Sequence, residues 1–125
     1  MLKDFTQLEA WKRAMDLAER IHTLTKEFPR EEIYGVTSQM RRAALSIAAN
    51  IAEGFGRYTY ADKMHKYVQA RGELIELMTF VHYCRRVGYI RIDEDLASLL
   101  NDCTTVHKLL NGLITKMDAL DRPKS

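Results

Sequence analysis

The stretch from Ser38 to Gly54 constrains the fold of this chain more than any other part. On a helical wheel its apolar residues cover two adjoining quadrants, one around Met40 and Ile47 and the other around Leu45. From Arg42 onward its polar side chains form one narrow stripe, because they recur every three or four residues; they are Arg42, Ser46, Asn50 and Glu53. Two sides of such a helix require burial, so the sequence predicts a small helical bundle that self-associates.

Length and composition set the class of protein. With 125 residues, the chain is large enough for one core and too small for two. A composition of 46% hydrophobic and 29% charged residues with only two prolines is typical of a soluble helical protein. The sequence shows neither a signal peptide nor an apolar run of membrane-spanning length. We therefore expect a cytoplasmic protein with no membrane partner.

The first half of the chain contains signals for two helices. Thr6–Glu9 fits the S/T-x-x-E capping box, with Phe5 as a hydrophobic staple, and Pro29 ends the first helix after residue 28. A second helix is expected to begin near Val36 and to end in the glycine-containing run Gly54–Gly56. Both helices are long enough to contribute to one bundle.

The second half contains two longer amphipathic segments. The third helix is expected from Thr59 or Tyr60 to about Val87, with a buried face formed by Tyr60, Met64, Tyr67, Val68, Arg71, Leu74, Ile75, Met78 and His82. The fourth is expected to begin at Asp93 and carries two heptad series, Leu96, Cys103, Leu110, Met117 and Leu99, Val106, Leu113, Leu120. Four helices with short connections predict an all-α, antiparallel up-and-down four-helix bundle. It spans residues 1–125 as one domain, with frayed tails at 1–5 and 121–125.

Surplus apolar residues and the two cysteines complete this picture. A second apolar face is expected to form an interface between subunits; its members are Leu45, Ala48 and Ala52 of the second helix and Leu77, Phe80, Val81 and Cys84 of the third. Two different faces of one bundle suit a ring closed by a heterologous contact. Cys84 and Cys103 differ by about 9 Å along a helical hairpin, so we expect two unpaired, buried thiols.

Several motifs closely resemble the bacterial four-helix-bundle family of 23S rRNA intervening-sequence proteins. The matching segments are Phe28–Gly35, Gln39–Ile47, Asn50–Gly54, Leu8–Trp11, Ala70–Leu74 with Glu76, and Gly88–Ile90. The chain departs from the family pattern at Glu73, where a small serine is usual, and at His22, where tyrosine is usual. The resemblance implies an up-and-down bundle that assembles into a ring, typically a homopentamer. It also implies an association with ribosomal RNA genes or a nucleic-acid-binding accessory role, and it brings no catalytic residues.

A nucleic-acid role would have to appear in the charges. Residues 36–92 carry nine basic and four acidic side chains, so the middle of the chain is its basic part. The candidates for phosphate contacts are Arg57, Lys63, Lys66, Arg85, Arg86 and Arg91, and those for base stacking are Tyr58, Tyr60 and Tyr89. Lysine and arginine are also ordinary residues of solvated helix faces. Three hypotheses therefore stay open: an RNA- or DNA-binding accessory protein, a structural or protein-binding oligomer without a nucleic-acid role and, far behind these two, a metalloenzyme.

The polar stripe of the second helix suggests a structural network. Arg71 lies at the centre of the predicted buried face of the third helix, where an unpaired guanidinium would be costly. We expect Glu53 to neutralise it, with Arg42 and Asn50 completing the network and Ser46 in the same stripe.

Metal and enzyme chemistry find little support. Ferritin-like bundles use Glu-x-x-His pairs, and the chain contains Glu19-x-x-His22 and Asp62-x-x-His65, but the fourth helix offers no inward carboxylate. We expect His22, like His82, to be packed and hydrogen-bonded instead. No nucleophile–base pair or phosphate loop is evident. The sequence predicts no enzyme activity, no catalytic or metal site, no cofactor and no small-molecule substrate.

Overall fold

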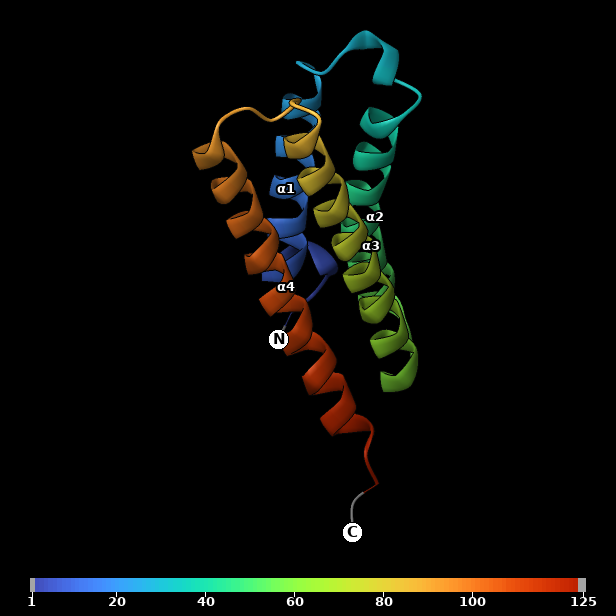
Figure 1. Cartoon of the computed structure of the whole chain (residues 1–125). Helices are drawn as coiled ribbons and strands as arrows, with labels where there is room; N and C mark the ends of the chain where they lie inside the picture. The colour runs from blue at the N-terminus through green and yellow to red at the C-terminus, as the bar shows by residue number, and fades with distance from the viewer. Residues whose placement is uncertain (1, 124–125) are drawn as a thin grey trace.

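The structure is a computed structural model that describes residues 2–123, and it is an antiparallel four-helix bundle (Figure 1). The helices are α1 (Glu9–Thr25), α2 (Val36–Gly56), α3 (Tyr60–Arg86) and α4 (Asp93–Asp121), with two short 3₁₀ turns, η1 (Phe5–Gln7) and η2 (Arg30–Glu32). Over residues 2–123 the chain forms no β-strand, and the predicted all-α class is confirmed.

Successive helices pack side by side, and α1 and α4 also contact each other. The α1–α2 and α3–α4 connections lie at one end of the bundle, and the α2–α3 connection lies at the other (Figure 1). Both ends of the described chain lie at this second end. This up-and-down path brings η2 close to the α3–α4 connection, since Tyr89 Oη donates a hydrogen bond of 2.7 Å to Glu32.

Local signals explain most helix ends. Thr59 caps α3 by accepting a hydrogen bond from the Asp62 backbone N–H, as its side chain suggests. Gly88 ends α3 with φ +89°, a conformation that favours glycine. The predicted capping box at Thr6 is wrong. Thr6 lies within η1, which Asp4 caps by accepting a hydrogen bond from the Thr6 N–H. Helix α1 begins only at Glu9 and has no side-chain cap.

Other boundaries shift by a few residues. Helix α1 ends at Thr25, three residues before the predicted end, and the chain then turns with the Phe28 N–H donating to the Thr25 carbonyl. Of the predicted frayed tails, Phe5 belongs to η1 and contacts Trp11 at 5.4 Å between ring centroids, while Asp121 is the last residue of α4. Residues 1, 124 and 125 lie outside the described part of the chain.

Helix α2 contributes the face that its pattern predicts, and so does α4 along most of its length, although the last heptad residue, Leu120, is 47% exposed. The buried residues of α2 include Met40, Ala43, Ala44, Ile47, Ala48 and Ile51, and those of α4 are Leu99, Cys103, Val106, Leu110 and Met117. Leu45 is 56% exposed, as expected for a residue outside the core. Ala48, in contrast, is buried within one chain, so its predicted place in an interface is wrong.

The predicted buried face of α3 is confirmed at Tyr67 and Leu74 and wrong at several other positions. Leu77, Val81 and Cys84, expected on a second face, are fully buried, whereas Val68 and Ile75 from the expected core face are 40% and 51% exposed. The apolar residues of α3 extend around more of its circumference than its neighbours cover. Packing against α2, which the sequence does not reveal, decides which of them face inward.

The two thiols are free and buried, as predicted. Burial raises the pKa of Cys84 to about 12 and that of Cys103 to about 11. The Sγ atom of Cys84 lies 3.6 Å from the Sδ atom of Met40, so α3 and α2 are in direct core contact there.

Candidate nucleic-acid interface

The six predicted cationic residues form two groups rather than one surface. Arg57, Lys63 and Lys66 lie at the α2–α3 end of the bundle. The second group, at the end where α3 meets α4, is Arg85, Arg86 and Arg91. At 1.5 Å per residue along α3, Lys63 and Arg85 are about 33 Å apart. The chain therefore presents two small basic groups.

Most of the first group is held by neighbouring groups of the same chain. Lys66 Nζ lies 2.9 Å from a carboxylate oxygen of Glu53, and this contact lowers the pKa of Glu53. Lys63 donates a hydrogen bond to the Phe55 carbonyl and lies 5.5 Å from the centroid of the Phe55 ring. Arg57 is exposed and, within residues 2–123, makes no ion pair. Only this arginine of the group is fully available to a phosphate.

The second group shows the same division. Arg85 Nη2 lies 2.9 Å from Asp93 Oδ1, and Arg91 Nε donates to the Gly88 carbonyl at 3.3 Å. Arg86 is exposed and has no hydrogen-bond or ion-pair partner in the described chain. Each end of the bundle thus offers one unengaged arginine among the predicted residues.

The predicted stacking tyrosines also divide. Tyr58 is 98% exposed and Tyr60 43% exposed, so both rings at the α2–α3 end can meet a base. Tyr89 cannot do so freely, because its ring packs against Phe28 at 5.3 Å. Its hydroxyl donates to Glu32, and this hydrogen bond raises the pKa of Tyr89 to about 12.

The predicted network around Arg71 is wrong. Arg71 Nη1 donates to Asn111 Oδ1 of α4 at 2.9 Å, while Glu53 is occupied by Lys66 on the other flank of α3. Asn50 donates to the carbonyl of Ser46 within its own helix.

Arg42 has partners of its own on α3. It contacts the carboxylates of Glu73 and Glu76 at 3.4 and 2.7 Å, and its hydrogen bond to Glu73 is the main cause of its raised pKa. Arg42, Glu73 and Glu76 have long side chains that pair across helices, and the spacing of residues along one helix does not predict such pairs.

Sequence comparison gives the family. The model of one protein family, 23S rRNA-intervening sequence protein, matches residues 6–112 of this chain. The chain belongs to this family. The match confirms the resemblance seen in the motifs. No curated protein matches the chain.

A solved structure supports the same assignment. The chain is similar to a protein with unknown function from the S23 ribosomal protein family of Bacteroides thetaiotaomicron, with 29% sequence identity and a TM-score of 0.77. The similarity covers 84% of this chain and 97% of that one. Relatives of the 23S rRNA-intervening sequence family thus share nearly the whole bundle.

In this member of the family, the histidines do not pack as predicted. His22 and His82 are both exposed, since each lies on the outer side of its helix. His65 is exposed as well. Among the described residues, no group of three His, Cys, Asp or Glu side chains could hold a metal ion. None of the described helices is both long and apolar enough to cross a membrane.

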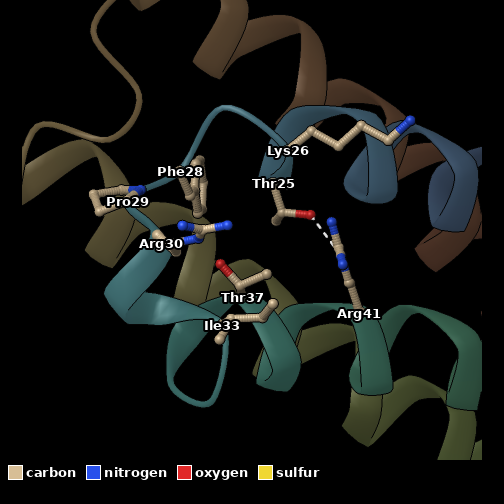
Figure 2. A pocket seen from close by; sticks show the side chains of 8 residues that line it. All are labelled: Thr25, Lys26, Phe28, Pro29, Arg30, Ile33, Thr37 and Arg41. Carbon is tan, nitrogen blue, oxygen red and sulfur yellow. Dashed lines mark hydrogen bonds between the residues drawn. The ribbon is translucent and has the colours of Figure 1, made fainter.

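Three cations near the α1–α2 connection were not among the predicted site residues. Lys26, Arg30 and Arg41 border a pocket between the end of α1, η2 and the start of α2. In the sequence they lie within or beside the family motifs, but spacing gives no sign that they meet. The structure brings them together because the connection folds back between the two helices (Figure 2).

Proposed function

We propose that this protein is a non-enzymatic, self-associating four-helix bundle that acts as an RNA-associated accessory protein. The observation that carries the proposal is a pair of exposed apolar surfaces on opposite sides of the bundle. RNA association is supported by membership of the 23S rRNA-intervening sequence family and by the unengaged arginines at both ends.

The first apolar surface is a groove between α1 and α2. Met15, Ala18 and Leu45 supply its apolar lining, and it encloses about 260 Å³. Leu45 is 56% exposed although it lies in the middle of a helix most of whose other large apolar side chains are buried. Such a residue loses exposed apolar area when a second subunit covers the groove.

The second apolar surface is a ridge on α3 on the side that faces α4. Val68 and Ile75 are seven residues apart, so they lie on one side of the helix, two turns from each other. Arg71, between them, donates to Asn111 of α4, which fixes the side of α3 on which the ridge lies. We infer that the ridge of one subunit enters the α1–α2 groove of the next.

A contact between two different surfaces is heterologous, and it generates a ring when the rotation closes. A homopentamer is the ring that we propose here. In a ring, Arg57 and Arg86 repeat once per subunit, so weak single contacts with phosphates combine into avidity of about 10² or more.

Assembly is tested by light scattering on three lysine variants. Leu45→Lys and Ile75→Lys each damage one surface and should give monomers. Ile92→Lys adds the same charge at a residue that is equally exposed but outside both surfaces, and it should leave the ring intact. A mixture of the first two variants should form a one-to-one dimer, because one undamaged groove can still meet one undamaged ridge. A wild-type monomer at micromolar concentration would refute the assembly.

RNA association is tested by fluorescence anisotropy of a single-stranded oligoribonucleotide at several salt concentrations. The logarithm of the affinity should fall linearly with the logarithm of salt, by about 0.7 per neutralised phosphate. Arg57→Gln and Arg86→Gln should each flatten this slope. Lys108→Gln removes an equal charge from the exposed side of α4 and should not change it.

The second candidate function is a structural or protein-binding oligomer without nucleic acid. It is favoured by one observation, that Lys63, Lys66 and Arg85 are engaged within their own chain. A ring that binds no RNA at low salt would leave this function as the conclusion.

A further inference from the structure

A pocket with three cationic side chains lies where α1, η2 and α2 meet, and we call it the α2 N-terminal pocket. Figure 2 shows its lining, which consists of Thr25, Lys26, Phe28, Pro29, Arg30, Ile33, Thr37 and Arg41. Three of these side chains are cationic, and of the eight described lining residues none is acidic. The pocket is therefore suited to an anion.

Thr37 carries a hydroxyl without a partner. Its side chain belongs to a residue that is only 4% exposed, and its oxygen points into the pocket towards Arg30 (Figure 2). Within residues 2–123 this hydroxyl has neither a donor nor an acceptor. The oxygen is not among the fully enclosed, unpartnered side-chain atoms of the described residues, so it opens into the pocket, where it is free to bond a ligand.

Thr25, on the opposite wall of the pocket, differs from Thr37 because its hydroxyl is hydrogen-bonded. It is equally buried, but its hydroxyl donates to the Ile21 carbonyl at 2.8 Å and accepts from Arg41 Nε at 2.8 Å. This contact holds the guanidinium of Arg41 at the pocket. A guanidinium has five N–H donors, so Arg41 keeps donors for a ligand after its bonds to Thr25 and to the His22 carbonyl.

The first turn of α2 adds positive electrostatic potential at the pocket, which favours an anion. The N–H groups of Val36, Thr37 and Ser38 have no acceptor in the described structure, and Ser38 turns its hydroxyl to the Gly35 carbonyl instead of capping them. A helix N-terminus with free N–H groups carries partial positive charge and attracts anions. Arg30, which is exposed and adjacent, adds a full charge.

The size of the pocket limits the ligand. Its volume of about 240 Å³ lies below the roughly 300 to 1,000 Å³ of pockets that take drug-sized ligands. We propose that the α2 N-terminal pocket binds a phosphate group, with Arg30, Arg41 and the Thr37 hydroxyl as donors. Lys26 extends away along the rim (Figure 2) and adds charge without a direct bond. Both a free phosphate ion and an RNA phosphodiester present non-bridging oxygens that these donors could bind. The inference therefore goes beyond the proposed function, since it does not require the ligand to be RNA.

The test is calorimetric titration of the whole protein with inorganic phosphate in a chloride background. Wild type should bind one phosphate per subunit. Arg30→Gln removes a charge-assisted bond and should weaken binding about tenfold or more. Thr37→Val removes only the hydroxyl and should weaken binding about threefold to tenfold, whereas Thr37→Ser keeps it and should bind as wild type does. Lys108→Gln, on the exposed side of α4, removes an equal charge outside the pocket and should have no effect.

A second titration with a short oligouridylate that lacks terminal phosphates identifies the source of the group. If it competes with inorganic phosphate, the pocket holds an RNA phosphodiester; if it does not, the pocket holds a free or terminal phosphate, and both results support a phosphate site. Absence of saturable phosphate binding by the wild type would overturn the proposal. So would equal losses in Arg30→Gln and Lys108→Gln, or wild-type affinity in Thr37→Val. Because inorganic phosphate probes the pocket alone, these outcomes are independent of whether the ring binds RNA.

Discussion

Gly54 offers a sharp test of the packing between α2 and α3. A Cβ atom at this position would lie 2.7 Å from Cε1 and 2.9 Å from Cδ1 of Tyr67, and 3.1 Å from Cβ of Lys66. Carbon atoms in good contact are about 3.5 to 4.0 Å apart, so the Tyr67 ring would have to move by about 1 Å. The ring is 2% exposed and packed in the core, so it has little room for this movement.

The magnitude follows from two opposing effects of Gly54→Ala. Replacing a helical glycine by alanine gains about 1 kcal/mol, because alanine restricts the unfolded chain. Overpacking a core costs about 1 to 3 kcal/mol, and a buried, rigid ring places the cost at the upper end. We therefore expect Gly54→Ala to lower the free energy of unfolding by about 1 to 2 kcal/mol.

Gly72 provides the matched control. It lies in the middle of α3, is exposed, and has no neighbouring atom within 4 Å of the place that a Cβ would occupy, so Gly72→Ala should gain about 0.5 to 1 kcal/mol. Thermal unfolding of both variants at one protein concentration should separate their midpoints by about 10 °C. Adding Tyr67→Leu to Gly54→Ala should recover part of the loss, because the clash disappears. Equal stability of the two alanine variants would refute the contact between Gly54 and the ring.

Three further changes test the remaining contacts. In urea unfolding, Leu77→Ala should lower the free energy of unfolding by about 2 to 5 kcal/mol and His82→Ala by about 0.5 kcal/mol or less. The reverse order would mean that His82, as periodicity predicts, lies on the buried face of α3 and that Leu77 does not. Glu53→Ala should leave the melting temperature nearly unchanged, because Glu53 is 53% exposed and pairs with Lys66 and not with Arg71; a large drop would contradict this. The two cysteine thiols have raised pKa values in the folded state, so their contribution to stability is complete below pH 9 and is lost as pH rises towards 11 to 12. Urea midpoints that stay flat from pH 8.5 to 10.5 in wild type, and match those of a double Cys→Ala variant, would argue against this.

The parts of the fold that the sequence predicted well depend on local signals. Thr59 caps α3 because its own side chain reaches the Asp62 N–H, and Gly88 ends that helix because its backbone permits φ +89°. The heptads of α4 are buried at Leu99, Cys103, Val106 and Leu110, since a narrow apolar stripe can face only one way. Each of these features is decided within a few residues.

The buried face of α3 is determined by contacts with other helices and not by signals within α3 itself. Apolar side chains lie on most sides of this helix, from Val68 and Ile75 on one flank to Leu77 and Phe80 on the other, so periodicity gave no single direction. Contacts with α2 and α4 choose the face that is buried, and the other flank becomes surplus. The sequence therefore predicted correctly that α3 has more apolar surface than one bundle needs, but it assigned the surplus to the wrong residues.

The candidate site depends still more on contacts between distant residues. Lys66 and Arg85 look like free cations in the sequence, yet each meets a carboxylate that only the fold brings near. Thr37 looks like an ordinary helix residue, and its hydroxyl becomes significant only because the fold turns it into a pocket towards Arg30 of η2, with Arg41 lining the same pocket. Charge counting finds which residues could bind a phosphate, whereas burial and partner geometry decide which of them remain able to do so. By that criterion, the phosphate contacts that we propose for this chain are Arg57 and Arg86 at the ends and the donors of the α2 N-terminal pocket, rather than a continuous basic surface.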